Sequence, residues 1–133
     1  MQSDEGDRIR LTAPAVPEAA RIARVAAAGL ATRAGFTYRE VEEVRLAVGE
    51  AAALLAGEAP EDRARLVVVY LLAPHGLHVE MHVEDGDHLP GVLVPDMAAA
   101  VLEATVDRWE VSKADRRVEL HKRRTQLDDE DDE

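Results

Sequence analysis

Apolar residues recur at intervals of three and four in two stretches of the N-terminal half of the chain. The first covers residues 18–34 and is followed by Gly35, a residue that commonly ends a helix. The second, EVEEVRLAVGEAAALLAG, covers residues 40–57 and is preceded by Thr37, with Glu40 three residues later in the pattern of a capping box. The apolar stripe of this second stretch consists of Val41, Val44, Val48, Ala51 and Leu55. The sequence therefore predicts two consecutive helices, with Thr37 as the N-cap of the second.

Five shorter stretches alternate or are rich in β-branched residues, as is typical of strands. They cover residues 8–12, 66–72, 77–83, 109–111 and 118–122. The second and third are joined by APHG and form a predicted hairpin, and a third helix is predicted at about residues 96–106, after a Gly- and Pro-containing loop at 85–95. The order β-α-α-β-β-α-β-β predicts an α+β fold, in which helices group around an antiparallel-rich sheet as a two-layer α/β sandwich.

The strand at residues 77–83 has one apolar and one polar face. Its apolar residues are predicted to face the helices, whereas His78, Glu80, His82 and Glu84 point outward. His78 and His82 would lie about 13 Å apart on one strand, which is too far to share an ion. No metal site is therefore predicted.

Length and composition favour one domain with a polar lead and an acidic tail. The chain has 133 residues, of which 47% are hydrophobic, enough for an ordinary core. We assign residues 1–7 to a flexible lead, 8–124 to a single domain and 125–133 to a disordered tail. The tail ends in DDEDDE, a block of like charges that cannot bury apolar area to offset its chain entropy.

Charge and residue usage narrow the classes of partner. The formal charge is −11 and aromatic residues make up 3%, so direct binding of nucleic acid or of an anionic membrane is not expected, whereas a basic protein partner is. The absence of cysteine excludes disulfides and thiolate metal sites. No N-terminal apolar run resembles a signal peptide or a membrane span, and a cytoplasmic location is therefore expected.

One carboxylate occupies an otherwise largely apolar second face of the helix at 40–57. At about 100° per residue, Glu50 points away from the apolar stripe, and Leu54 lies over it one turn later. From these residues alone, a solvated glutamate is the favoured interpretation, because Glu is common on helix surfaces. The alternative is a functional pocket in which Glu50 is retained and a second polar residue has been lost. The pattern of motifs along the whole chain favours this alternative.

That wider pattern resembles a known family. A helix, a Gly-Phe linker, the string VRLAVGEAA, a hairpin, an acidic-Gly loop and the closing strand VELHKRR are similar to the anti-sigma factor and serine kinase branch of the GHKL ATPases, from Ile9 to about Arg123. The resemblance implies a GHKL (Bergerat) sandwich, with a mixed sheet covered on one face by three helices. In the family, a Glu of the second helix is the general base and an Asn four residues later binds magnesium. Glu50 matches the base, but Leu54 stands at the Asn position and has no oxygen for a hard cation.

The other nucleotide motifs of the family also depart from their pattern. The adenine-binding Asp-x-Gly-x-Gly reads EDGDH, in which Gly86 matches, Glu84 replaces the Asp and His88 replaces the second Gly. The lid segment LPGVLVPDMA has one glycine, and the Gly-Thr before the closing strand reads Asp115-Arg116. The chain resembles an actinobacterial-type group in which the motif's Asn is likewise absent.

The resemblance implies an anti-sigma regulatory factor that sequesters an alternative sigma factor without efficient ATP hydrolysis or kinase activity. It implies no resident cofactor, a possible second partner in an anti-anti-sigma (STAS-type) protein, and a homodimer. In the family the sigma-binding surface lies on the side of the first helix, where Arg21, Arg24 and Arg33 could pair with acidic groups or remain solvated. The alternative is an active serine-protein kinase that phosphorylates an anti-anti-sigma protein, with ATP and Mg²⁺ as cofactors, Glu50 as base and magnesium held by another group. A generic acidic interaction domain is the third possibility.

Overall fold

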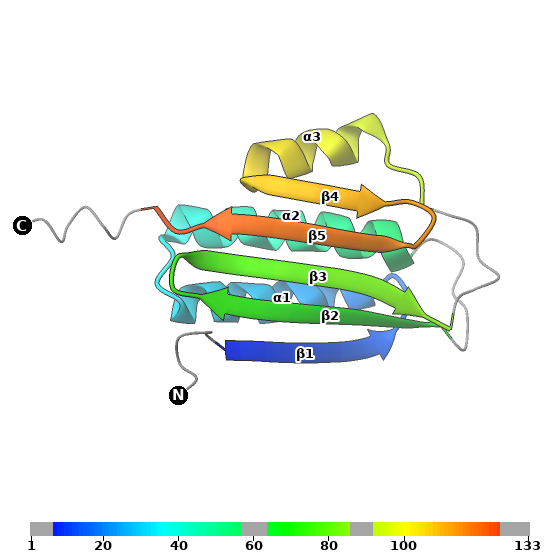
Figure 1. The fold of residues 1–133 in the computed structure, drawn as a ribbon, viewed down its shortest axis with the longest axis horizontal. Coiled ribbons are helices and arrows are strands. Elements are labelled where there is room, and N and C mark those ends of the chain that lie inside the picture. The colour runs from blue at the N-terminus through cyan, green and yellow to red at the C-terminus, as the bar shows by residue number, and fades with distance from the viewer. Residues whose placement is uncertain (1–6, 57–63, 86–91, 126–133) are drawn as a thin grey trace, which may run out of the picture.

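The computed structural model describes residues 7–56, 64–85 and 92–125. In chain order the elements are β1 (Asp7–Pro14), α1 (Ala19–Arg33), α2 (Tyr38–Ala56), β2 (Arg65–Ala73), β3 (Gly76–Glu84), α3 (Asp96–Thr105), β4 (Arg108–Ser112) and β5 (Arg117–Arg123) (Figure 1). The predicted order is confirmed, and each predicted boundary lies within two residues of the observed one. In the described part of the chain, no helix is long and apolar enough to cross a membrane.

The strands form one sheet in the order β1-β2-β3-β5-β4, and every pairing in it is antiparallel. The expectation of a mixed sheet is thereby corrected. The reason is visible in the connections, because α1 and α2 run along the sheet and back, so that β2 starts at the end where β1 finished (Figure 1). The pair α3 and β4 makes the same return between β3 and β5, and an out-and-back connection yields antiparallel neighbours.

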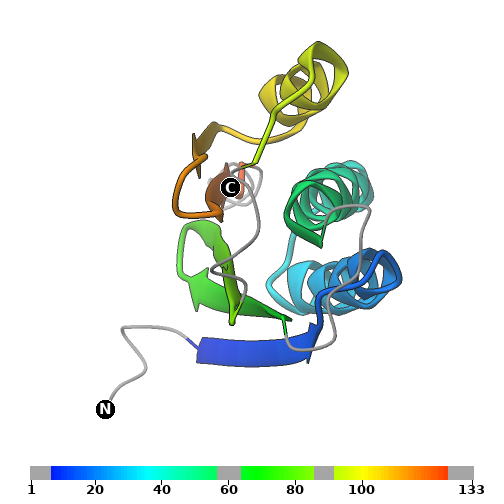
Figure 2. The same cartoon turned by 90° about the vertical axis from the view of Figure 1, so that its right-hand side faces the viewer.

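The helices lie on one side of the sheet, which confirms the two-layer sandwich (Figure 2). The predicted apolar stripe of α2 is buried, and it packs against buried residues of the sheet such as Val79, Met81 and Leu120. As predicted, the alternation along β3 sends Leu77, Val79 and Met81 into the core. The opposite face of the sheet carries no helix among the described residues and is called here the open face.

A capping box fixes the start of α2, as the sequence predicts. The Glu40 amide donates to Thr37 Oγ1 at 3.1 Å, and the Thr37 amide donates to Glu40 Oε1 at 2.8 Å. The second carboxylate oxygen of Glu40 accepts hydrogen bonds from the backbone amide and the hydroxyl of Thr125, at 3.2 and 2.7 Å. One buried carboxylate therefore joins the first turn of α2 to the chain that leaves β5.

Two further side chains hold the layers in register. The buried hydroxyl of Tyr70, on β2, donates to the Ala23 carbonyl of α1 at 2.9 Å. Lys122, on β5, donates to Glu43 of α2 at 2.7 Å and to the Thr105 carbonyl at the end of α3 at 2.8 Å. Polar groups enclosed between layers stabilise a fold when they are paired, so these contacts specify how the helices lie on the sheet.

Candidate functional site

The sequence-predicted site residues gather at one end of the molecule. The C-terminal end of α2, the C-terminal end of β3 and the turn between β4 and β5 lie together there (Figure 1). Glu50 and Leu54 belong to the last two turns of α2, and Glu84 is the last residue of β3. Gly86, together with His88 and the first part of the lid segment, lies outside the described residues.

Glu50 and Leu54 are both partly exposed and lie one helical turn apart. The Leu54 side chain packs against the edge of the hydrophobic core, so this position is apolar in its contacts as well as in its identity. Ala47, one turn before Glu50 on the same helix, is fully buried and lies against β3 and β5. The result is a single carboxylate, one turn before a leucine that offers no oxygen to a magnesium ion.

The Glu84 side chain makes its polar contacts on the open face of the sheet. Its Oε2 lies 3.1 Å from His82 Nε2 and 3.6 Å from Arg10 Nη2, an ion pair that reaches from β3 to β1 across β2. The helices lie on the other face of the sheet, and the adenine-binding role that the motif match gives to Glu84 stays a prediction. The next residue, Asp85, leaves the strand with φ of 61° and is exposed.

Arg116 is a residue that the sequence analysis treated only as a mismatch. Its φ is 54°, in the left-handed region that favours glycine. Its Nη2 donates to the Leu55 carbonyl at 2.8 Å, so a cation lies at the C-terminal end of α2, where the helix dipole favours positive charge. No sequence signal could have identified this contact, because it joins residues 61 positions apart.

The exposed side of α1 carries both charge and apolar surface. Arg21 and Arg33 are exposed, whereas the Arg24 stem lies over Gly49 of α2, where an added Cβ would meet its Cδ. Between them Ile22 and Val25 are 47% and 66% exposed. Arg24 is therefore partly used in packing α1 on α2, and Arg21 and Arg33 keep the exposure that pairing with a partner requires.

The open face brings together two histidines from different strands. His78 of β3 is the cross-strand partner of His121 of β5, and their rings stack with centroids 4.0 Å apart and an interplanar angle of 15°. Burial lowers the pKa of His121, and the nearby His78 and Arg108 add to this effect, while Glu119 and Glu80 oppose it. The distance argument that excludes a site within one strand does not apply to this pair, which strand pairing creates.

The comparisons with known proteins point in one direction. No family model matches the chain. The chain is 36% identical over 77 residues to "Serine-protein kinase RsbW" of Listeria monocytogenes serotype 4a, a match that covers 56% of this chain and 49% of that protein. It is also 42% identical over 48 residues to "Serine-protein kinase RsbW" of Bacillus subtilis, covering 36% and 30% of the two chains. The match thus spans about half the length of the Listeria relative at modest identity.

Proposed function

We propose that this protein is an anti-sigma regulatory factor of the GHKL type, which binds an alternative sigma factor and restrains transcription by sequestration. The similarity to RsbW kinases and the order of the family motifs support the branch. The observation that carries the non-catalytic form of the proposal is Leu54, which lies one turn after Glu50 on α2 and packs against the core. The degenerate, actinobacterial-type site, the cytoplasmic location and the homodimer belong to the same proposal.

The chemistry of phosphoryl transfer explains why Leu54 matters more than Glu50. A kinase contributes little covalent chemistry of its own and works by positioning the phosphates and neutralising their charge, mainly through magnesium. Glu50 could still accept a proton from a substrate hydroxyl, but without a metal ligand one turn away the phosphates lack their main cation. Asp85 and Asp115 add negative charge at the same end of the molecule. Both the affinity for ATP and the rate of phosphoryl transfer should therefore be low, and no resident cofactor is proposed.

The binding function rests on a different part of the fold. The exposed side of α1 presents Ile22 and Val25 between arginines, and an apolar patch with a charged rim is typical of protein interfaces. We propose this side of α1 as the contact for the sigma factor, and an anti-anti-sigma (STAS-type) protein as a competing partner. Neither contact uses Glu50 or Leu54, so loss of nucleotide chemistry would leave both intact.

One alternative keeps the enzymatic activity. Both relatives are named serine-protein kinases, and Glu50 retains the base position. Under this alternative the chain phosphorylates an anti-anti-sigma protein with ATP and Mg²⁺, and a group other than residue 54 holds the metal.

Calorimetric titration with magnesium-ATP and magnesium-ADP separates the two functions. Wild type should show no binding at millimolar nucleotide, and Leu54→Asn should gain measurable affinity. Tyr38→Asn is the matched control, because Tyr38 lies at the opposite end of the same helix and is 80% exposed, so it introduces the same amide far from Glu50. Micromolar binding by wild type would contradict the non-catalytic proposal, and transfer of labelled phosphate from ATP to a STAS-type protein would then establish the kinase.

Binding to sigma factors needs its own experiment. Each alternative sigma factor of the source organism should be tested with the purified chain by gel filtration, without nucleotide. We expect one of them to form a complex that Ile22→Glu or Val25→Glu abolishes, while Leu54→Asn leaves it unchanged. If none of the sigma factors binds, with or without ATP, the anti-sigma function is wrong.

A further inference from the structure

Strands β3 and β5 bring three potential metal ligands together on the open face, away from α2. Glu119 and His121 lie on one face of β5, and His78 lies opposite His121 on β3. Each residue offers one ligand atom, and these atoms all lie within 4.8 Å of one another. His78 Nε2 is 3.8 Å from Glu119 Oε1. Two imidazoles and a carboxylate from neighbouring strands thus converge on one small volume.

The Nε2 atom of His78 gives an independent indication that this cluster binds a ligand. The His78 side chain is 26% exposed, yet its Nε2 atom is shielded from solvent and has no hydrogen-bond partner among the described residues. Its closest acidic neighbours, the carboxylates of Glu80 and Glu119, are both 3.8 Å away, beyond hydrogen-bonding distance. A shielded nitrogen without a partner is unfavourable, and a bound ion would satisfy it.

We propose that His78, Glu119 and His121 bind a divalent transition-metal ion of the zinc class. Imidazole nitrogen with one carboxylate oxygen suits Zn²⁺, Co²⁺, Ni²⁺ or Cu²⁺, whereas Mg²⁺ and Ca²⁺ prefer sites built of oxygen. Zinc–nitrogen and zinc–oxygen bonds of about 2.0–2.2 Å require ligand atoms roughly 3.3–3.5 Å apart. One imidazole must rotate out of the stacked arrangement to reach that separation, and both rings are partly exposed and can do so. Water completes the coordination.

The charges that face the cluster come from three strands. Glu80 of β3 is the cross-strand partner of Glu119 and favours a cation, and it lies close enough to orient the His78 ring. Arg108 of β4 is the cross-strand partner of His121 and opposes a cation. Glu110 of β4, the other cross-strand partner of Glu119, adds a further negative charge, whereas Arg123 lines the same hollow as the two histidines.

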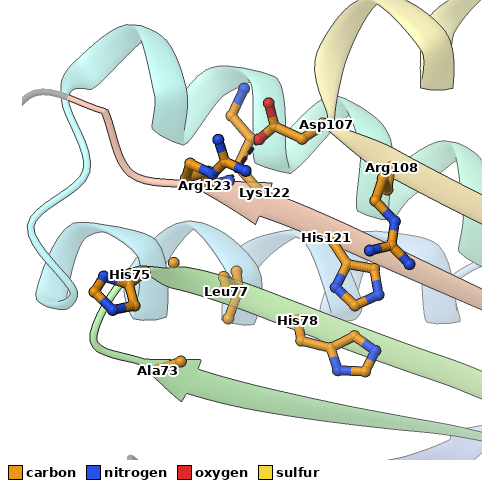
Figure 3. A pocket seen from close by; sticks show the side chains of 10 residues that line it. Ala73, His75, Leu77, His78, Asp107, Arg108, His121, Lys122 and Arg123 are labelled. Atoms are coloured by element: carbon orange, nitrogen blue, oxygen red, sulfur yellow. Dashed lines mark hydrogen bonds between the residues drawn. The ribbon is translucent and has the colours of Figure 1, made fainter.

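The cluster also has access to solvent. His78 and His121 line an open hollow of about 230 Å³, with Arg108 and Arg123 on its wall (Figure 3). The picture shows the two imidazoles side by side, with the Arg108 side chain next to His121. The hollow gives an ion a route of entry and leaves room for the waters that complete its coordination.

Calorimetric titration of the full chain with zinc chloride, in a large excess of magnesium chloride, tests the proposal. The magnesium saturates weak binding to acidic side chains such as those of the tail. We expect one zinc ion to bind per chain, and His78→Gln and His121→Gln each to weaken binding by roughly tenfold or more. His82→Gln is the matched control, because His82 lies on the same face of β3 but is already partnered by Glu84, and it should bind zinc like wild type.

Absorption by cobalt(II) provides a second readout that does not depend on the fold being weakened. Wild type and His82→Gln should give the visible bands of a protein-bound ion, and His78→Gln should give only those of the hydrated ion, while far-UV circular dichroism shows that all three are folded. The proposal is overturned if wild type does not bind zinc in excess magnesium, or if His82→Gln loses as much affinity as His78→Gln. Leu54→Asn should bind zinc like wild type, so failure here leaves the proposed function untouched.

Discussion

Replacing Glu40 with alanine is expected to lower the free energy of unfolding by about 2–3 kcal/mol. The carboxylate is 6% exposed and accepts three hydrogen bonds, one from the Thr37 amide and two from Thr125. A helix cap contributes about 1 kcal/mol, and hydrogen bonds to a charged group contribute about 1.5–3 kcal/mol when buried. Thr37 and Thr125 are exposed residues, so water recovers part of the loss, and the lower end of this sum applies.

The Glu40→Gln variant separates the stability contributed by the helix cap from the stability contributed by the negative charge. Glutamine keeps one acceptor oxygen for the Thr37 amide but offers Thr125 an amide group in place of the second acceptor, so about half of the loss is expected. Burial alone would raise the pKa of Glu40, but the hydrogen bonds from Thr37 and Thr125 outweigh it and hold this pKa below its ordinary value of 4.5. The stability that the charge contributes is therefore present above pH 4.5 and is lost as the pH falls through the lowered, folded-state pKa.

Urea unfolding followed by far-UV circular dichroism, at neutral and at acid pH, measures both effects. Glu42→Ala is the control, because Glu42 lies on the same helix and makes only a partly exposed pair with Arg45 at 3.3 Å, worth about 0.5 kcal/mol or less. The gap between wild type and Glu40→Gln should narrow at acid pH. If that gap is the same at both pH values, or if Glu40→Ala is no worse than Glu42→Ala, the role given to this carboxylate is refuted.

Three further substitutions test the contacts that hold the layers together, each by urea or thermal unfolding. Gly76→Ala should destabilise the fold by more than about 2 kcal/mol, because the added Cβ would collide with the Lys122 backbone carbonyl. Stability close to that of wild type would show that the β3–β5 pairing is looser than described. Tyr70→Phe removes the hydroxyl that donates to the Ala23 carbonyl and should lower the free energy of unfolding by about 1–3 kcal/mol. A decrease below about 0.5 kcal/mol would contradict this hydrogen bond. Lys122→Met keeps the apolar stem but leaves Glu43 unpaired, and a loss of about 1–2 kcal/mol is expected, whereas unchanged stability would contradict the link.

The helices could be predicted closely because their signals are local. The apolar stripe of α2 and the capping box of Thr37 and Glu40 are each contained within a few turns of chain. The direction of the strands is not carried by any local pattern, but it could have been deduced from the predicted order of elements. A mixed sheet and an antiparallel sheet share the same alternation along β3, and the difference lies in how many elements connect one strand to the next.

In the candidate site, too, some features follow from local sequence spacing and others depend on contacts between distant segments. Helical spacing alone places Leu54 one turn after Glu50, because 3.6 residues make a turn. For Glu84 two sequence arguments disagreed, since alternation placed it on the open face and motif matching placed it at the adenine. Its contact with His82 agrees with the alternation. The pairing of His78 with His121 depends on strand register, which no single-sequence pattern specifies.

The position of α2 is set by contacts that do not involve a nucleotide. Glu40 anchors its first turn, Lys122 holds Glu43 on the next, and the guanidinium of Arg116 bonds the Leu55 carbonyl near its end. Glu50 and Leu54 lie on a helix that is thus fixed at both ends. Under the proposed function, a leucine at position 54 would replace a metal ligand without moving the helix, and the fold would survive the loss of phosphoryl transfer. It also follows that Leu54→Asn should change the unfolding free energy by about 1 kcal/mol or less, since this side chain is only partly buried. A gain of nucleotide affinity in that variant would then report on the chemistry at position 54. A large loss of stability would show that the Leu54 side chain contributes more to the core than its partial burial indicates.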